Sequence, residues 1–287
     1  MSIPEEQLEV WSHQGAITTA QRTHESIRTA LSSHQWPEGV NFDVSLQGSY
    51  KNVTNVRGDS DVDVVVKLKT TFYHNLTEEE RRLLRITPAS YRWTDFRNDV
   101  LVALRHYYGD RNVRPGKHAV KVGGGNGRLT ADVVASAVYR EYANLTVVWD
   151  DGMVLWSQPD CTTIINYPES HYDNGASMNA RTTGVYKPTV RLFKNARNRC
   201  IDEGLIRQES CPSYFLECLL YNVPVEKFVN DHQNTYCNVL NWLVQADLSF
   251  CLCQNGRQFL FGGDSTQWSL TDAEGAIRGL VDLWNGS

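Results

Sequence analysis

The sequence predicts an α+β protein in which an N-terminal half of strands and helices joins a helical C-terminal half. Strand-like runs rich in valine occur mainly before residue 156, whereas apolar residues recur at helical spacing after about residue 175. No repeat, low-complexity tract or obvious linker separates the halves. We therefore expect two closely joined domains, over residues 1–175 and 176–287, with the functional site in the cleft between them.

In the N-terminal half, residues 5–34 carry apolar side chains at helical spacing and predict one long N-terminal helix. Residues 41–46 look extended, and the segment GSYKNVTNVRGDS that follows predicts a turn, a short helix and a loop. Residues 61–68 (DVDVVVKL) predict a strand and residues 92–108 a helix.

Two further strands are expected in HAVKV (118–122) and LTADVVASAV (129–138), joined by the turn GGGNGR. Another β region is expected over 145–156. Helices are predicted from Pro188 to Ile201, from Ser213 onward, over 225–246 and at the C-terminal end, where Thr271 and Glu274 form a capping box.

The composition is that of an ordinary globular protein, with 41% hydrophobic and 21% charged residues and a net charge of -5. Proteins that hold long nucleic acids through their phosphates usually have a basic surface. The acidic balance therefore weighs against a nucleic-acid polymerase or a DNA-activated sensor. It does not weigh against a nucleotide substrate, which needs only a local basic patch.

No signal peptide or membrane-spanning run is visible, and the seven cysteines have no framework spacing. This pattern is typical of reduced thiols in a cytoplasmic protein. The C-x-C of Cys251 and Cys253 could indicate zinc, but no closed set of four ligands accompanies it. We therefore expect these cysteines to be small buried side chains, and the protein to be cytoplasmic without membrane contact.

The strand DVDVVVKL directs Asp61 and Asp63 to one face and the intervening valines to the other. Two like charges side by side on a strand repel each other. The pair makes sense if cations lie against it, because such carboxylates can bridge two Mg²⁺ ions about 3.5–4 Å apart. On this motif alone, an exposed polar edge strand stays an open alternative.

The segment before this strand adds specificity. Gly48 lets the backbone approach a phosphate, and Ser49, twelve residues before Asp61, can bind it together with the N–H groups of a helix start. A third carboxylate is needed, and Asp132 in the apolar run LTADVV is the best candidate. An unpaired carboxylate there would be costly to bury, which favours a metal ligand.

In the C-terminal half, Lys187, Arg191 and Lys194 are spaced i, i+4, i+7, so one helical face presents three cations that could grip phosphates. A solvated basic face is the alternative. Ser213 at a helix start can serve as an N-cap or an anion site, and Tyr214 can stack a base or fill the core.

Together, QGSYKNVTNVRGDSDVDVVV and LTADVV resemble the polymerase-β-like nucleotidyltransferase superfamily. More narrowly, the chain resembles the bacterial cGAS/DncV-like nucleotidyltransferases of the CdnE type, over nearly its whole length, including the segment SYFLECLLYNVP. The resemblance implies a mixed sheet with a long N-terminal helix, packed on a C-terminal helical bundle. The zinc-binding insertion of animal cGAS is absent, which argues against a DNA activator.

The resemblance implies synthesis of cyclic di- or trinucleotides from ribonucleoside triphosphates, as signals in bacterial anti-phage (CBASS) defence that a separate effector protein reads. It implies two Mg²⁺ ions, with Mn²⁺ as a substitute, and a monomeric enzyme. The positions it places in the site are Gln47, Gly48 and Ser49 on the donor triphosphate, Asp61, Asp63 and Asp132 on the metal, and Lys194, Ser213 and Tyr214 on the triphosphate tail and base.

Asn166 lies in a segment that lines the nucleobase pocket in the family it resembles. An amide matches the adjacent O4 and N3–H of uracil, so we expect ATP and UTP as substrates and cyclic UMP-AMP as the product. An asparagine that merely satisfies the turn before Pro168 is the alternative reading. Cyclic di-UMP and cyclic di-AMP are the other products considered.

Three other functions share these carboxylates or this fold. A linear oligonucleotide synthase or terminal RNA nucleotidyltransferase would make a ladder of products. An enzyme that nucleotidylates an antibiotic or a protein would need its acceptor. An inactive nucleotide-sensing scaffold usually lacks one of the carboxylates, and here all three are present.

Overall fold

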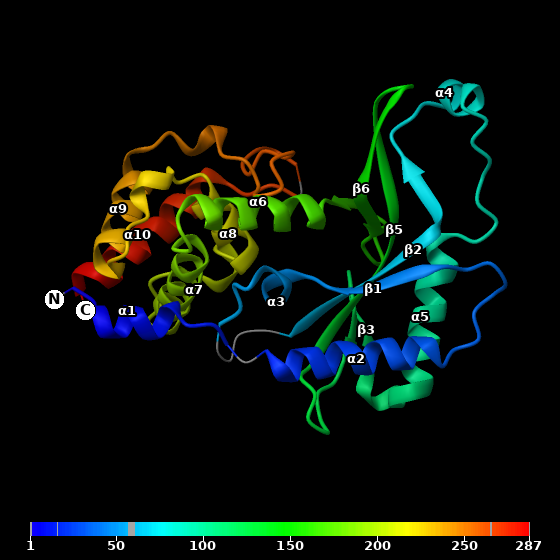
Figure 1. The fold of residues 1–287 in the computed structure, drawn as a ribbon, viewed down its shortest axis with the longest axis horizontal. Coiled ribbons are helices and arrows are strands. Elements are labelled where there is room, and N and C mark those ends of the chain that lie inside the picture. Colours follow the sequence, from blue (N-terminus) through cyan, green and yellow to red (C-terminus); the bar gives the residue numbers. More distant parts are fainter. Residues whose placement is uncertain (1, 16, 57–60, 265, 287) are drawn as a thin grey trace. The chain divides into compact units, whose positions relative to one another are not determined.

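The computed structural model describes residues 2–15, 17–56, 61–264 and 266–286, and it confirms the predicted α+β class (Figure 1). The chain forms two compact units. We call residues 16–50 and 61–169 the sheet unit, and residues 1–15, 51–60 and 170–287 the helical unit.

These units differ from the expected linear division at residue 175. The N-terminal helix α1 (Glu5–Ser12) packs against α7 (Tyr186–Asp202), far along the chain. The guanidinium group of Arg191 in α7 donates hydrogen bonds to the main-chain carbonyls of Ser12 and Val53. Residues 1–15 and 51–60 therefore belong to the helical unit. Hydrophobic periodicity along the sequence does not predict this assignment.

The sheet unit is built on a mixed seven-stranded sheet. Along its main path the order is β1 (Phe42–Leu46), β2 (Val62–His74), β5 (Ala131–Asn144), β4 (Val120–Val122) and β3 (Val113–Pro115). The second half of β5 also pairs with β6 (Val147–Trp156), which in turn pairs with β7 (Thr163–Asn166). β2 and β5 run parallel, and the other pairs are antiparallel.

Two helices pack against each other and against this sheet: α2 (Thr18–Ser32) and α5 (Trp93–Tyr108), as Figure 1 shows. Ile27 and Leu31 of α2 and Phe96 and Leu104 of α5 are fully buried. They form one core with the valines of β2. The short helix α4 (Glu78–Leu83) has no buried residue, and η1 (Asp110–Asn112) leads into β3.

In the helical unit, α7 contacts α1, α8 (Ser213–Tyr221), α9 (His232–Gln245) and α10 (Leu270–Gly286). Its large buried side chains, Tyr186 and Phe193, belong to a second hydrophobic core. The remaining elements are α6 (Pro168–Arg181), η2 (Gln208–Ser210), η3 (Val225–Lys227) and η4 (Leu248–Phe250). The chain passes between the units within α3 (Gly48–Asn52) and at the start of α6.

The expectation of one long helix over residues 5–34 is wrong, because α1 ends at Ser12 and α2 begins at Thr18. After α1 the chain turns extended at His13, and the main-chain N–H of Gly15 donates to the carbonyl of Asn55. A side chain at Gly15 would meet the carbonyl oxygen of Val56 at 2.9 Å. This close approach to residues 55 and 56 interrupts the helix that the apolar spacing predicts.

Two other local predictions need correction. The last helix is capped by Ser269, whose hydroxyl accepts a hydrogen bond from the main-chain N–H of Asp272, and not by Thr271 with Glu274. Helix α6 was not predicted, because its sequence is largely polar and only a few of its residues are buried. Its start at Pro168 fits the preference of proline for the first helical turn.

All seven cysteines are free, and Cys251 and Cys253 are buried as expected. Across the residues that the structure describes, no group of three histidine, cysteine, aspartate or glutamate side chains converges as a metal-binding set. None of the helices described here combines the length and apolarity needed to cross a membrane.

We expect Gly15→Ala to destabilise the protein, because the added methyl group would press on the carbonyl of Val56. The expected loss is about 1–3 kcal/mol, the usual cost of forcing extra volume into a packed site. Urea unfolding monitored by circular dichroism measures it. The matched control is Gly275→Ala in α10, where an added Cβ meets no atom within 4 Å. This control should stabilise the helix by about 0.5–1 kcal/mol. Equal stability of Gly15→Ala and wild type would contradict the explanation of the helix break.

Candidate active site

The carboxylates of Asp63 and Asp132 lie side by side on adjacent strands. In the parallel ladder of β2 and β5, Asp63 is the direct partner of Asp132. Their neighbours Val62, Val64 and Val133 are completely buried in the core of the sheet unit. The alternation expected for DVDVVVKL is thus confirmed, and the third carboxylate that the sequence selected does lie beside the first two.

Asp61 lies just before β2, and its carboxylate accepts a hydrogen bond from the hydroxyl of Thr130, which lies just before β5. The side chain of Asp61 is 42% exposed and that of Asp132 is 26% exposed. The three carboxylates therefore lie where two parallel strands begin, and the side chains of Asp61 and Asp132 are partly exposed.

Lys121 completes this cluster and was missed by the sequence analysis. It lies on β4 directly across from Asp132. Its Nζ is 3.3 Å from Oδ1 of Asp132 and 3.7 Å from Oδ2 of Asp61. The charge of Asp132, and then that of Asp61, raises the pKa of Lys121. The signal was present in the sequence, because the predicted hairpin of HAVKV and LTADVV brings a lysine opposite this aspartate once its register is fixed.

The Gly48-Ser49 motif lies against the same carboxylates. Gly48 has φ +64°, and a Cβ at this position would collide with Oδ2 of Asp63. The main-chain N–H of Gln47 donates to the carbonyl of Asp63 at 2.9 Å. Only glycine fits here, because the backbone conformation is left-handed and the carboxylate occupies the space of a side chain. The two motifs are thus packed together, and their contact with phosphate stays a prediction.

The chemistry of this donor set fits Mg²⁺, which binds carboxylate oxygens. Oδ1 of Asp132 is buried and accepts no hydrogen bond, although it lies near the ammonium group of Lys121. Among the described residues no group of three carboxylates converges on a common centre, and Lys121 lies beside Asp61 and Asp132. The chemistry of the carboxylates fits a metal ion, and their role as its ligands stays a prediction.

Asn166 ends β7 and pairs with Met153 of β6. It is half-buried, and its amide makes no hydrogen bond within the described part of the chain. The role of this amide, in the turn before Pro168 or at a nucleobase, therefore stays a prediction.

The three cations of α7 do not form a solvated basic face, the alternative considered for them, and their contact with phosphate stays a prediction. Lys187 is half-buried, Arg191 is 9% exposed and Lys194 is 2% exposed. The guanidinium of Arg191 is occupied by main-chain carbonyls, and burial lowers its pKa to about 10. The reason is tertiary, because the segments at residues 12 and 53–54 cover this face of the helix.

Lys194 belongs to a buried polar network around Glu217 of α8, another residue that the sequence analysis missed. Its ammonium group pairs with Oε1 of Glu217, which also accepts a hydrogen bond from the hydroxyl of Thr54 at 2.5 Å. Nε2 of His171 lies 3.3 Å from Oε2. Burial by itself would raise the pKa of Glu217, but the charge of Lys194 and the contact with His171 lower it to about 2. Lys194 is therefore a structural cation in this conformation.

Ser213 and Tyr214 open α8. Ser213 is the first helical residue, and its hydroxyl has no hydrogen-bond partner among the residues described. Tyr214 is 41% exposed, and its ring stacks on His171 with 5.3 Å between centroids and 23° between planes. Tyr214 is thus partly exposed, and one face of its ring packs on His171, which belongs to the network around Glu217.

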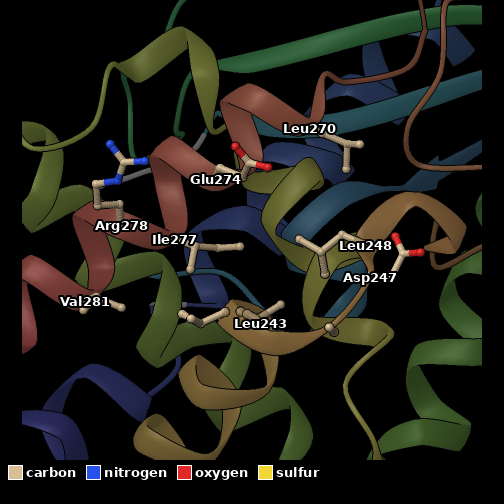
Figure 2. A pocket seen from close by; sticks show the side chains of 10 residues that line it. Leu243, Asp247, Leu248, Leu270, Glu274, Ile277, Arg278 and Val281 are labelled. Carbon is tan, nitrogen blue, oxygen red and sulfur yellow. The ribbon is translucent and has the colours of Figure 1, made fainter.

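A pocket of about 440 Å³ in the helical unit is unrelated to these residues (Figure 2). It lies between α9, η4 and α10, and its walls are largely apolar, with Leu243, Leu248 and Ile277 among them. Charged groups lie at Asp247, Glu274 and Arg278. None of the candidate catalytic or nucleotide-binding residues lines this pocket.

Known proteins resemble the chain in both sequence and structure. A model of the C-terminal helical domain of cGAS/DncV-like nucleotidyltransferases matches residues 173–285. Over 289 aligned residues the chain is 50% identical to the cyclic UMP-AMP synthase of Rhodothermus marinus, a match that covers 100% of this chain and 99% of that protein. It is 35% identical to the cyclic nucleotide synthase CdnE01 of Staphylococcus haemolyticus, covering 99% of each.

The structure of Rhodothermus marinus CdnE, a c-UMP-AMP synthase crystallised with Apcpp and Upnpp, has the same fold as this chain. The TM-score is 0.92, and the match covers 99% of this chain and 97% of that one. At 50% identity, the likeness extends over the sheet unit and the helical unit.

The Glu217 network leads to a prediction about stability. Glu217→Gln should destabilise the protein by about 3–5 kcal/mol at neutral pH, because it leaves the Lys194 ammonium buried beside an uncharged group. The folded pKa of Glu217 is lowered, so its contribution is present above its unfolded value near 4.5 and is lost as pH falls toward about 2. Urea unfolding at pH values from about 7 to about 3 should therefore show the difference between variant and wild type shrinking with acid.

The control is Glu226→Gln, which removes the same charge from an exposed position in η3. It should leave stability within about 0.5 kcal/mol of wild type, as substitutions at ordinary surface positions do. A stable Glu217→Gln variant, or a gap that does not change with pH, would contradict the buried ion pair.

Proposed function

The chain belongs to the cGAS/DncV-like nucleotidyltransferases, of the CdnE type, and we propose that it joins two ribonucleoside triphosphates into a cyclic dinucleotide with release of pyrophosphate. The observation that supports this most is the in-register pair of Asp63 and Asp132 on β2 and β5, with Asp61 two residues before Asp63. Gly48 of the glycine-serine motif packs against Asp63 of this pair.

Two successive transfers make the product. In each, a ribose hydroxyl attacks the α-phosphorus of a triphosphate, a new P–O bond forms, the bond to the β-phosphate breaks, and pyrophosphate and a proton are released. The first transfer gives a linear dinucleotide that keeps one triphosphate, and the second closes the ring. Catalysis of this kind depends mainly on positioning the reactants and on stabilising charge on the phosphates.

Asp61, Asp63 and Asp132 are assigned as ligands of two Mg²⁺ ions, with Mn²⁺ as a substitute. When bound, these ions would neutralise charge on the phosphates and favour ionisation of the attacking hydroxyl. The protein's own contribution is to fix Asp63 and Asp132 on two rigid strands and to hold Gly48 against Asp63. Gln47, Gly48 and Ser49 are assigned to the donor triphosphate.

In the helical unit, Lys187, Ser213 and Tyr214 are assigned to the nucleotides. The hydroxyl of Ser213 is free at the start of α8, where the helix dipole favours an anion. The exposed part of the Tyr214 ring is available to stack a base. Arg191 and Lys194, which the sequence also assigns to phosphate, are buried, and they bond to main-chain carbonyls and to Glu217.

The product is proposed to be cyclic UMP-AMP, made from ATP and UTP. Two observations support it: the amide of Asn166 has no partner in the described part of the chain, and the Rhodothermus marinus relative with 50% identity is a cyclic UMP-AMP synthase. An amide offers both the donor and the acceptor that the uracil edge needs. We further propose that the product is a second messenger of anti-phage defence in the bacterial cytoplasm and is read by a separate effector.

Incubation of the purified protein with Mg²⁺ and all four ribonucleoside triphosphates tests the reaction. After phosphatase treatment, mass spectrometry should find a resistant cyclic dinucleotide. Asp63→Asn should lower its formation by about 10³-fold or more, because positioning and charge stabilisation supply most of the rate. Asp43→Asn, on the adjacent strand β1 and exposed, is the control that should stay active with an unchanged circular dichroism spectrum. A ladder of linear products would instead identify a terminal nucleotidyltransferase.

The choice of base is tested with Asn166→Ser. We expect the ratio of uridine to adenosine in the product to fall about tenfold or more, because a hydrogen-bonding base pocket loses discrimination when its polar partner is removed. Competition between radiolabelled UTP and ATP measures the ratio, while total turnover with ATP alone serves as the internal control. An unchanged ratio would show that Asn166 does not recognise uracil. It would not contradict the proposed cyclisation reaction.

A further inference from the structure

Two lysine side chains meet the ring of Tyr172 in the helical unit. The Nζ of Lys51 lies 5.3 Å from the ring centroid, and the Nζ of Lys187 lies 5.4 Å from it. Lys51 belongs to α3, Tyr172 to α6 and Lys187 to the first turn of α7. Cations at this distance are attracted by the negative face of an aromatic ring. The ring therefore holds two ammonium groups from different elements close together.

The charge of this pair is not neutralised within the described part of the chain. Neither Lys51 nor Lys187 forms an ion pair with a carboxylate there, whereas the neighbouring Lys194 pairs with Glu217. Two ammonium groups near one ring repel each other across a distance comparable with the Debye length of about 8–10 Å. The attraction of a single ring, about 0.5–1 kcal/mol at exposed sites, offsets only part of this repulsion.

The surroundings add positive charge. Arg191 lies one helical turn after Lys187, and its guanidinium donates to main-chain carbonyls, which are uncharged. Burial lowers the pKa of Lys187, the charge of Glu217 raises it, and the charge of Arg191 lowers it. Glu217 is already paired with Lys194, so a multivalent anion could balance the charges of Lys51 and Lys187.

We propose that Lys51 and Lys187, held by Tyr172, bind the oligophosphate tail of a nucleoside triphosphate. This assigns Lys51 as a further substrate-binding residue and Tyr172 as a positioning residue that keeps the two ammonium groups together. The proposal rests on the proposed function. Lys51 lies two residues after Ser49 in the same helix α3, so the element that carries the phosphate motif also supplies this cation. An ammonium group binds phosphate as a point charge and tolerates several orientations of the tail.

Isothermal titration of the full chain with inorganic tripolyphosphate, in the presence of EDTA, tests the site without metal or base. Lys51→Met should raise the Kd about tenfold or more, the size expected for a lost charged hydrogen bond. Tyr172→Leu should also weaken binding, and Tyr172→Phe should restore it, because phenylalanine keeps the ring. The matched control Lys69→Met removes an equal charge from β2 and should bind as wild type. Adenosine monophosphate should bind wild type and Lys51→Met equally.

Wild-type affinity in Lys51→Met, or an equal loss for tripolyphosphate and adenosine monophosphate, would overturn the proposal. So would a wild-type protein that binds no tripolyphosphate. The product assay separates this from the function. If the wild type makes cyclic product and Lys51→Met binds tripolyphosphate normally, the proposed oligophosphate site is wrong and the synthase function stands. If binding depends on Lys51 but no cyclic product forms, the oligophosphate site stands and the proposed synthase function is wrong.

Discussion

The parallel pairing of β2 with β5 sets Asp63 directly beside Asp132, and the rest of the candidate site is arranged around this pair. Like charges in neighbouring positions of a sheet cost free energy. The register is nevertheless fixed, because Val62, Val64 and Val133 are completely buried and a slip by one residue would move an aspartate into the core position of a valine. The packing of these valines thus imposes an unfavourable but chemically useful juxtaposition of the two aspartates. Lys121 and Thr130 partly compensate for it.

In the helical unit a buried cation is paired with a buried carboxylate. Lys194 and Glu217 are both buried, and each has its partner, with Thr54 and His171 completing the hydrogen bonds of the carboxylate. A buried pair of this kind contributes little net stability compared with an apolar core, but breaking it is costly. Its consequence here is geometric. His171 supports the ring of Tyr214, so the interior network is connected to a surface that can meet a base.

Inside the helical unit the buried cation Lys194 is paired with Glu217, whereas Lys51 and Lys187, which meet at Tyr172, form no ion pair within the described part of the chain. In the sheet unit the carboxylates of Asp61 and Asp132 share one lysine, Lys121. The chain supplies these groups from elements that follow each other closely in sequence, since α3 carries Gly48 and Ser49 at its start and Lys51 near its end.

The sequence by itself determined the α+β class, the strand with Asp61 and Asp63, the choice of Asp132, and the glycine at position 48. These follow from periodicity and from local backbone preference, which act over a few residues. The tertiary structure decided which cations are available, because neighbouring segments cover Arg191 and Lys194, whereas Lys51 and Lys187 form no ion pair with a carboxylate in the described part of the chain. It also decided the break after Ser12 and the partners of Glu217. Contacts between residues far apart in sequence determine these features, and hydrophobic spacing does not predict such contacts.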